Sequence, residues 1–376
     1  MHFEKNETFL KKHKARIIGL DIIRCIAILS VVYAHGKNLL PEKLYSSYES
    51  FNIIKIDGVT VFFILSGFLV GRILIKSIFE TSFTKKELIN FWIRRWLRTI
   101  PTYLLVLTGL LGYRILIFND FSDFDIRYFF FVQNFFSLHP EFFPEAWSLS
   151  FEEWFYLLFP FICFLSYKLF NNKNLSILIS ISTFLILPLL NRIFIYEYSN
   201  DIINLDSEFR KIIILNIDSL IYGFIAAYLY TKQIDFWIKY KNSFFYTGII
   251  ALILIYFNPG NWRNFYPPLS VNIESFTLMC FLPFLSSYKT TNIKILDAFL
   301  IFISLISYSM YLLNLSIIQG YVIPIMNNLL GRNDYTLESV YVSNYIAYWL
   351  FTIFGSYLLY NFFERPITNL RDKIKI

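Results

Sequence analysis

Cysteine is scarce in this sequence of 376 residues, which contains only three, at positions 25, 163 and 280. The odd number argues against a disulfide framework, and the three residues lack the paired spacing of cysteine-based metal sites. Each of them lies inside a long apolar stretch. We therefore expect Cys25, Cys163 and Cys280 to be packing residues, and we expect no metal site.

Charged residues are also few: they make up 16% of the chain, against 56% hydrophobic and 20% aromatic residues. This composition excludes an ordinary soluble domain, which needs a polar surface. The net charge is +7, but no nucleic-acid-binding motif accompanies it, so the basic residues are expected to face anionic lipid headgroups. The composition predicts an integral, multi-pass membrane protein that contacts membrane lipids and no nucleic acid.

Internal repeats, low-complexity tracts and long polar segments are absent as well. The longest predicted loops, 36–56 and 119–146, are too short for a soluble domain. Residues 1–35 have the charge and hydropathy of a signal peptide, but no small-residue cleavage site follows them, whereas further apolar stretches do. We expect one integral-membrane domain over residues 1–376, with a short cytoplasmic segment at 1–16, an uncleaved first helix and no fused soluble domain.

Long apolar runs recur along the whole chain. A hydrocarbon core about 30 Å thick takes roughly 20 helical residues to cross. The predicted spans are 17–35, 57–76, 99–118, 148–168, 174–194, 212–230, 244–257, 272–288, 295–320 and 341–363. They predict an all-α fold, a polytopic transmembrane bundle of about ten helices.

The distribution of Lys and Arg predicts the orientation of this bundle, because these residues accumulate on the cytoplasmic side. With the amino terminus inside, the segments between the spans alternate between basic and acidic. Basic segments contain Lys11, Lys12, Lys14 and Arg16, or Lys85, Lys86, Arg94, Arg95 and Arg98, or Arg365, Arg371, Lys373 and Lys375. Acidic segments contain Asp120, Asp123, Asp125, Glu141 and Glu145, or Glu197, Asp201, Asp206 and Glu208. Both termini are therefore expected in the cytoplasm.

The first predicted span, LDIIRCIAILSVVYAHG (20–36), contains two ionisable residues, Arg24 and His35. Such groups cost several kcal/mol at membrane depth unless they are paired or hydrated, which makes them candidates for function. Their separation is close to three helical turns, so they share one helix face with about 16 Å of rise between them. Alternatively, Arg24 pairs with Asp21 and His35 is a polar residue at a helix end.

A second cluster lies in PEAWSLSFEEWFYLLFP, residues 144–160. Ser148, Glu152 and Tyr156 are spaced i, i+4 and i+8, which places a hydroxyl, a carboxylate and a phenol on one helix face. Glu152 is expected at a depth similar to that of His35, where it could orient the imidazole or transfer a proton. Alternatively, the acidic pair is solvated at a helix N-terminus, where negative charge is favourable.

Two further motifs involve arginine and glycine. FWIRRWLRTIPTY (91–103) interleaves three arginines with two tryptophans, and the fork of N–H donors on arginine suits phosphates. Anchoring at the cytoplasmic face explains the same residues. In GVTVFFILSGFL (58–69), the Ser-Gly pair favours close packing of two helices.

Together these motifs resemble the acyltransferase 3 family of membrane acyltransferases. GLDIIRCIAILSVVYAH (19–35) is similar to the family's GLDGLRAIAVLLVVLFH-like first helix, with Arg and His at the same separation. The family's GVxxFFVLSGFL, Arg-x-x-Arg, WSLSVEEQFYLL, SYSLYLLH and ERP motifs are matched in the same order. The matching segments are GVTVFFILSGFL, Arg95 with Arg98, WSLSFEEWFYLL (147–158), SYSMYLLN (307–314) and ERP (364–366). Asn314 stands where the family often has His, so catalysis is not expected to depend on a second histidine.

The resemblance implies transfer of an acyl group, commonly acetyl, from cytoplasmic acyl-CoA to a hydroxyl of a carbohydrate or glycolipid at the other face of a bacterial cytoplasmic membrane. It implies acetyl-CoA as the donor substrate and no permanently bound cofactor. His35, with an unperturbed pKa of about 6.5, would be the general base, assisted by Glu152. Residues implied to contact CoA are Arg24, Arg95 and Arg98, and those implied to bind substrate are Trp147, Ser148, Glu153, Tyr156 and Asn314.

Two other classes of protein fit part of the pattern. A transporter or flippase of a lipid-linked saccharide also buries Arg, His and Glu, but it usually shows a repeat between its halves, which this sequence lacks. A structural or assembly subunit leaves Arg24 and His35 unexplained. The acceptor stays open among O-antigen, exopolysaccharide, capsule, glycolipid and a macrolide-like small molecule, as does direct transfer against an acyl-enzyme intermediate.

Overall fold

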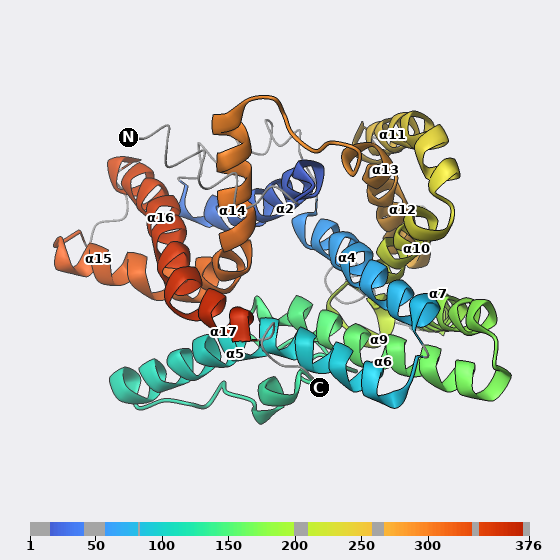
Figure 1. The fold of residues 1–376 in the computed structure, drawn as a ribbon. Coiled ribbons are helices and arrows are strands. Elements are labelled where there is room, and N and C mark those ends of the chain that lie inside the picture. Colours follow the sequence, from blue (N-terminus) through green and yellow to red (C-terminus); the bar gives the residue numbers. More distant parts are fainter. Residues whose placement is uncertain are drawn as a thin grey trace.

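The computed structural model describes residues 16–40, 57–81, 83–198, 210–257, 267–332 and 338–370. These parts of the chain are helical and contain no strand (Figure 1). The predicted all-α membrane bundle is therefore confirmed. Most of the predicted segment 1–16 and of the loop 36–56 lies outside the described residues, as do Lys11, Lys12, Lys14, Asp201, Asp206, Glu208, Arg371, Lys373 and Lys375.

The helices follow one another with short connections. The first half of the chain forms α2 (Ile18–Gly36), η1 (Lys37–Leu39), α4 (Gly58–Glu80), α5 (Lys85–Phe118), η2 (Ile126–Phe130), α6 (Ala146–Phe170) and α7 (Lys173–Tyr198). The second half forms α9 (Ile213–Asn216), α10 (Ser219–Lys232), α11 (Ile234–Phe257), α12 (Pro267–Met279), α13 (Leu282–Leu285), α14 (Lys294–Leu313), the π-helix η4 (Asn314–Val322), α15 (Ile323–Leu329), α16 (Glu338–Leu359), the π-helix η5 (Tyr360–Glu364) and α17 (Arg365–Leu370).

Nine helices in the described part of the chain are long and apolar enough to cross a membrane. The predicted span 212–230 differs, because it folds as the short α9 followed by α10, which has 14 residues. At 1.5 Å per residue, α10 is only about 21 Å long. The interruption falls next to Asp218, whose fully buried carboxylate lies 2.7 Å from the guanidinium of Arg192.

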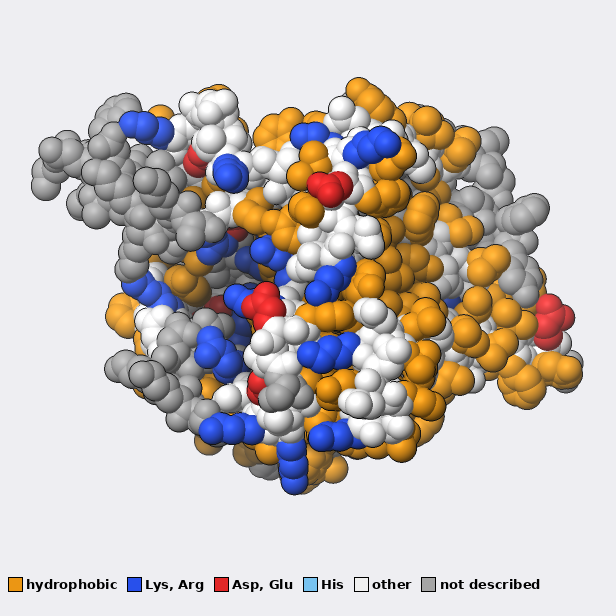
Figure 2. Space-filling model, turned by 45° about the vertical axis from the view of Figure 1, so that its right-hand side comes forward, with side chains coloured by type: hydrophobic (Ala, Val, Ile, Leu, Met, Phe, Trp, Pro, Cys, Tyr) orange, Lys and Arg blue, Asp and Glu red, His pale blue; other side chains and the backbone are white. Residues whose placement is uncertain are grey.

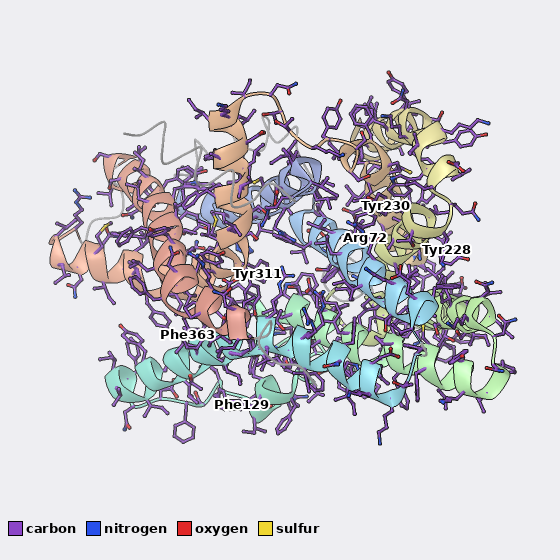
Figure 3. The ribbon with its side chains drawn as sticks, viewed as in Figure 1. Arg72, Phe129, Tyr228, Tyr230, Tyr311 and Phe363 are labelled. Atoms are coloured by element: carbon purple, nitrogen blue, oxygen red, sulfur yellow. The ribbon has the colours of Figure 1, made fainter. Side chains whose placement is uncertain are left out.

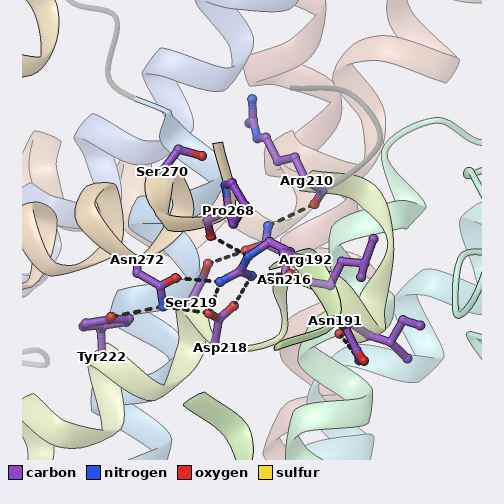
Figure 4. Close-up of polar contacts among 12 residues, drawn as sticks. Asn191, Arg192, Arg210, Asn216, Asp218, Ser219, Tyr222, Pro268, Ser270 and Asn272 are labelled. Atoms are coloured by element: carbon purple, nitrogen blue, oxygen red, sulfur yellow. Dashed lines mark hydrogen bonds and ion pairs between the residues drawn. The ribbon is translucent and has the colours of Figure 1, made fainter. Parts of the chain in front are cut away.

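Arg192 joins α7 to α9, α10 and α12 (Figure 4). Its guanidinium donates to both oxygens of Asp218, at 3.0 and 2.7 Å, to the Asn272 side chain at 2.6 Å and to the Pro268 carbonyl at 2.8 Å. Asn272 in turn donates to Asp218 at 2.8 Å. Removing one partner of such a buried pair costs about 3–5 kcal/mol, because the other charge is left uncompensated. This cluster therefore fixes the helices that pack behind α4.

Glycine allows α4 and α10 to approach closely. A Cβ atom on Gly67 would lie 2.1 Å from the Leu220 carbonyl oxygen, and one on Gly223 would lie 2.0 Å from the Ile64 carbonyl oxygen. Both distances are far below van der Waals contact, so only glycine fits at either position. The packing role predicted for the Ser-Gly pair in 58–69 is therefore confirmed for Gly67, whereas Ser66 lines the cavity described below.

In the view of Figure 1, α14 and α16 lie to the left of α4, α10 to α13 lie toward the upper right, and α5 and α6 lie below it. α2 packs against α14 and α4, α14 packs against α16, and α5 packs against α6. Large apolar side chains cover much of the outer surface, as expected for helices that face lipid (Figure 2). The three cysteines are buried and free, in α2, in α6 and after α12, as predicted for packing residues.

Candidate active site

A cavity of about 80 Å³ lies among α2, α4, α5, α6 and α14. α4 supplies most of its apolar wall, with side chains such as Val59, Phe62 and Leu69. Six of the predicted site residues, from three helices, line this one cavity: Arg24, Arg95, Arg98, Ser148, Glu152 and Tyr156. Residues that are up to 132 positions apart in the sequence are thus brought to a common space of mixed polarity.

α6 presents a row of polar groups to this cavity, as the i, i+4 spacing predicts. The Tyr156 hydroxyl donates to Glu152 at 2.7 Å, and the Ser66 hydroxyl of α4 donates to the other carboxylate oxygen at 3.0 Å. The indole N–H of Trp92 fixes the backbone of the same row, because it donates to the Tyr156 carbonyl at 3.0 Å. Glu152 is half-buried and faces the cavity, so it is not a solvated acid at a helix end.

The Arg24 side chain is held in place by a hydrogen bond to a residue of α14. One of its guanidinium nitrogens donates to the Ser304 hydroxyl at 3.2 Å, and that hydroxyl donates to Asp21 at 2.6 Å. Asp21 is buried and forms its ion pair with Arg16. The alternative expectation, a direct pair between Arg24 and Asp21, is therefore not what the described residues form, and the Arg24 side chain lines the cavity instead.

His35 lies outside the cavity lining and contacts Asn314 at the start of η4. Its Nδ1 is 2.5 Å from the Asn314 Oδ1. The Asn314 Nδ2 donates to the carbonyls of Met310 and Tyr311, at 2.9 and 2.8 Å, so the hydrogen-bond network assigns the amide oxygen to the imidazole. An amide oxygen only accepts hydrogen bonds, and Nδ1 must therefore carry the proton. This leaves a lone pair on Nε2.

The imidazole is oriented by Asn314, whereas Glu152 bonds to Ser66 and Tyr156. The expected contact between His35 and Glu152 is therefore not formed, and His35 is linked instead through Asn314 and Tyr311 to Ser148. The Tyr311 hydroxyl lines the cavity and lies 2.6 Å from the Ser148 hydroxyl, while its carbonyl accepts from Asn314. Figure 3 shows Tyr311 near the centre of the molecule, on α14. Tyr311 and Asn314 therefore connect the cavity to His35.

Glu145, the residue before α6, holds η4 in place. Its buried carboxylate accepts from the backbone N–H of Ser316 at 2.6 Å and from the Ser316 hydroxyl, and its carbonyl accepts from the Tyr311 hydroxyl at 3.0 Å. Burial raises the pKa of Glu145 to about 7. Burial also lowers the pKa of His139, in the same loop, to about 3, so His139 is neutral at physiological pH. Sequence reasoning counted Glu145 only as an acidic loop residue.

Trp147 and Glu153 are not among the residues that line the cavity. Trp147 packs edge-on against Phe63, with ring centroids 6.1 Å apart. Glu153 is buried against α5, where it accepts from the Thr99 hydroxyl at 2.6 Å. Their predicted contacts with substrate, like that of the fully buried Asn314, stay predictions.

Sequence reasoning gave no role in the site to several other polar residues in or near the cavity, and it gave Ser66 only a packing role. Ser66, Ser304 and Tyr311 belong to quoted or neighbouring segments, but their partners lie on other helices and leave no local pattern. Glu364, in the ERP motif, is buried and accepts from the Ser309 hydroxyl at 2.6 Å. Within the described ranges, no group of three or more His, Cys, Asp and Glu side chains is placed to hold a metal ion.

A protein family and several known proteins are similar to this chain. A family model described as an acyltransferase domain, that of the acyltransferase 3 family, matches residues 17–361. O-acetyltransferase OatA of Staphylococcus aureus strain NCTC 8325 is 30% identical over 171 residues, which are 42% of this chain and 26% of OatA. OatA of strain MRSA252 gives the same values. This chain thus matches only about a quarter of the length of these relatives.

No solved structure matches the chain. The family model, however, covers most of its length and includes every residue that lines the cavity, together with His35 and Asn314. The chain therefore belongs to the acyltransferase 3 family.

Proposed function

We propose that this protein is a membrane O-acyltransferase that transfers an acetyl group from cytoplasmic acetyl-CoA to a hydroxyl of a carbohydrate on the opposite side of the membrane. The observation that carries the proposal is the single cavity that unites Arg24, Arg95 and Arg98 with the polar row of α6. From this cavity, Tyr311 and Asn314 lead to an imidazole whose Nε2 has a lone pair. Family membership and the O-acetyltransferase name of the relatives support the same reaction.

In this proposal, His35 is the general base. Its Nε2 takes the proton of the acceptor hydroxyl while that oxygen attacks the thioester carbonyl carbon. The tetrahedral intermediate collapses, the carbon–sulfur bond breaks, and the CoA sulfur receives the proton from Nε2. Asn314 keeps Nδ1 protonated and stabilises the imidazolium that forms between the two proton transfers. The products are an acetyl ester and free CoA.

The remaining cavity residues divide into donor-binding and charge-stabilising groups. Arg95 and Arg98 suit the phosphates of CoA, because a guanidinium fork forms paired hydrogen bonds to phosphate oxygens. Arg24, fixed by Ser304, would stabilise negative charge that develops on the carbonyl oxygen. Glu152 would hold the hydroxyls of Ser66 and Tyr156 toward the donor and balance the charge of the arginines.

The proposal includes a topology with both termini in the cytoplasm of a bacterial cell, in which α9 and α10 together form a tenth crossing in addition to the nine long helices of the described residues. It rests on the basic residues at and after the ends of α4 and α10, which are Lys85, Lys86, Lys232, Lys239 and Lys241. In a background without the native cysteines, Ser137→Cys should react with a membrane-impermeant thiol reagent in intact cells, whereas Lys86→Cys should react only after the membrane is opened. Both positions are exposed to solvent in the structure. The reverse labelling pattern would contradict the route from cytoplasmic donor to external acceptor.

Acetyl transfer is tested with membrane vesicles from cells that produce the protein, since such membranes supply the natural acceptor. Labelled acetyl-CoA should release CoA and leave its label on membrane carbohydrate. His35→Ala should abolish both signals and still yield a folded protein, because its helix remains apolar. His139→Gln is the matched control, since His139 lies outside the cavity and should remain active. Wild-type rates in purified His35→Ala would rule out the proposed base.

A further inference from the structure

A second cavity, of about 540 Å³, lies beside the first, along α4 and the facing parts of α5 and α10. The two cavities share Leu69, Arg95 and Arg98. We call the second cavity the vestibule. The other residues that line the vestibule take no part in the acyl-transfer steps described above.

The vestibule is strongly cationic. In addition to Arg95 and Arg98, it is lined by Arg72, Lys76 and Lys232, against a single lining carboxylate, that of Glu80. Lys76 and Glu80 are 3.6 Å apart but mostly exposed, and such surface pairs contribute little. Figure 2 shows Lys and Arg side chains gathered around a hollow on one face of the molecule. A cavity of this charge attracts a multiply charged anion.

Aromatic rings orient two of the vestibule cations. The Arg72 guanidinium lies 4.6 Å from the ring centroid of Tyr230 and 5.6 Å from that of Phe68, and Figure 3 shows Arg72 beside Tyr230, between α4 and α10. The Lys232 Nζ lies 3.4 Å from the ring centroid of Phe79. Stacking holds a guanidinium by its face and leaves the N–H groups at its edge directed outward, where they can bind an anion.

We propose that the vestibule binds the 3′-phosphorylated nucleotide end of the acyl-CoA donor. This inference rests on the proposed function and adds residues to it. A 3′-phosphate carries a charge of about −1.5 to −2 at pH 7 and suits Arg72 and Lys232. Ile73 and Phe79 offer an apolar wall for the adenine ring. Because Arg95 and Arg98 border both cavities, one extended molecule can place its nucleotide in the vestibule and extend its acyl-bearing arm through the first cavity, past Glu152, toward His35.

The donor's own chemistry provides the first test. Steady-state rates are measured with acetyl-CoA and with acetyl-dephospho-CoA, which lacks only the 3′-phosphate. We expect KM to be about tenfold higher for the dephospho donor, as for the loss of one charge-assisted hydrogen bond, with kcat nearly unchanged. Equal KM values for the two donors would overturn the inference and leave the proposed acyl transfer intact.

Single substitutions then test whether Arg72 and Lys232 bind the 3′-phosphate of the donor. Arg72→Gln and Lys232→Gln should each raise KM for acetyl-CoA about tenfold and leave KM for acetyl-dephospho-CoA unchanged, because the lost partner is already absent from that donor. Lys168→Gln is the matched control: its Nζ lies 5.6 Å from the Phe164 ring on α6, outside the vestibule. If the vestibule variants impair both donors equally, their role is structural and the inference fails.

Binding is also measured directly, with adenosine 3′,5′-bisphosphate as the probe and 5′-AMP as its comparison, so that the vestibule is tested even where no acyl transfer is observed. Tighter binding of the bisphosphate that depends on Arg72 supports the inference. The measurements are made in nanodiscs with and without phosphatidylglycerol. An effect of Arg72→Gln that appears only with the anionic lipid would assign the vestibule to lipid headgroups and overturn the inference.

Discussion

Replacing Asn314 tests the assignment of the base most directly. Asn314→Leu has a similar volume but cannot accept the Nδ1–H of His35, which lies 2.5 Å from the present amide oxygen. The hydrogen bond alone is worth about 1 kcal/mol, which corresponds to roughly a fivefold change in rate. Loss of the productive tautomer of His35 lowers kcat by up to about 10⁴-fold, because Nε2 then presents an N–H to the acceptor hydroxyl in place of a lone pair. We therefore expect kcat to fall by between about 5-fold and 10⁴-fold.

Asn314→Asp separates this effect from damage to the fold. Both variants lose the two hydrogen bonds that Asn314 donates to Met310 and Tyr311, but only Asp still accepts from His35. Asp should thus retain much more activity than Leu, and its added negative charge should move the acid limb of the pH–rate profile to higher pH. Acetyl transfer by purified variants of equal thermal stability provides the measurement. Equal activities for Leu and Asp, or a wild-type rate for Leu, would refute the assignment of Nε2 as the base.

Three further predictions concern the donor, a buried acid and helix packing. Arg98→Lys should raise KM for acetyl-CoA about tenfold and change the acceptor KM little, because lysine has no planar fork; equal effects in a two-substrate kinetic analysis would contradict this. Burial raises the pKa of Glu145 from its usual range to about 7, so its stabilising contribution is complete below about pH 4.5 and is lost as the pH rises through 7. The melting temperature should fall over this range in the wild type and much less in Glu145→Gln; parallel curves would exclude Glu145 as the source. Gly67→Ala should destabilise the protein by about 1–3 kcal/mol in thermal unfolding, whereas Gly109→Ala, whose Cβ would contact nothing within 4 Å, should not; equal effects would refute the packing argument.

The sequence predicted the parts of this structure that depend on local periodicity. Long apolar runs located the spans, and the i, i+4 spacing correctly placed Ser148, Glu152 and Tyr156 on one face toward a cavity. α5, however, begins at Lys85 rather than near residue 99, because Thr84 and Glu87 form a capping box and helical structure extends beyond the apolar run. The residues 212–230 were apolar enough for a span, but hydropathy does not register the buried ion pair of Asp218 that accompanies their interruption.

The contacts between helices could not be predicted, because they join residues far apart in the chain. Asn314 is separated from His35 by 279 positions, and the sequence offered Glu152 as the nearer candidate for orienting the imidazole. The departure from the family motif at Asn314 was visible as the loss of a possible proton carrier. Its positive role, as an acceptor for Nδ1–H, becomes visible only when the donors of its amide are assigned to Met310 and Tyr311.

The start of α6 links the two parts of the candidate site, which are the cavity and the His35–Asn314 pair. Glu145 precedes α6 and binds residues on both sides of Asn314: it accepts from Tyr311 through its carbonyl and from Ser316 through its side chain. The next turns of α6 place Ser148 and Glu152 in the cavity. A shift of α6 would therefore move the cavity row and the partner of His35 together, which would keep the proposed donor site and the proposed base in register. This coupling explains why a carboxylate that is costly to bury is positioned at the N-terminal end of α6, although Glu145 does not itself line the cavity.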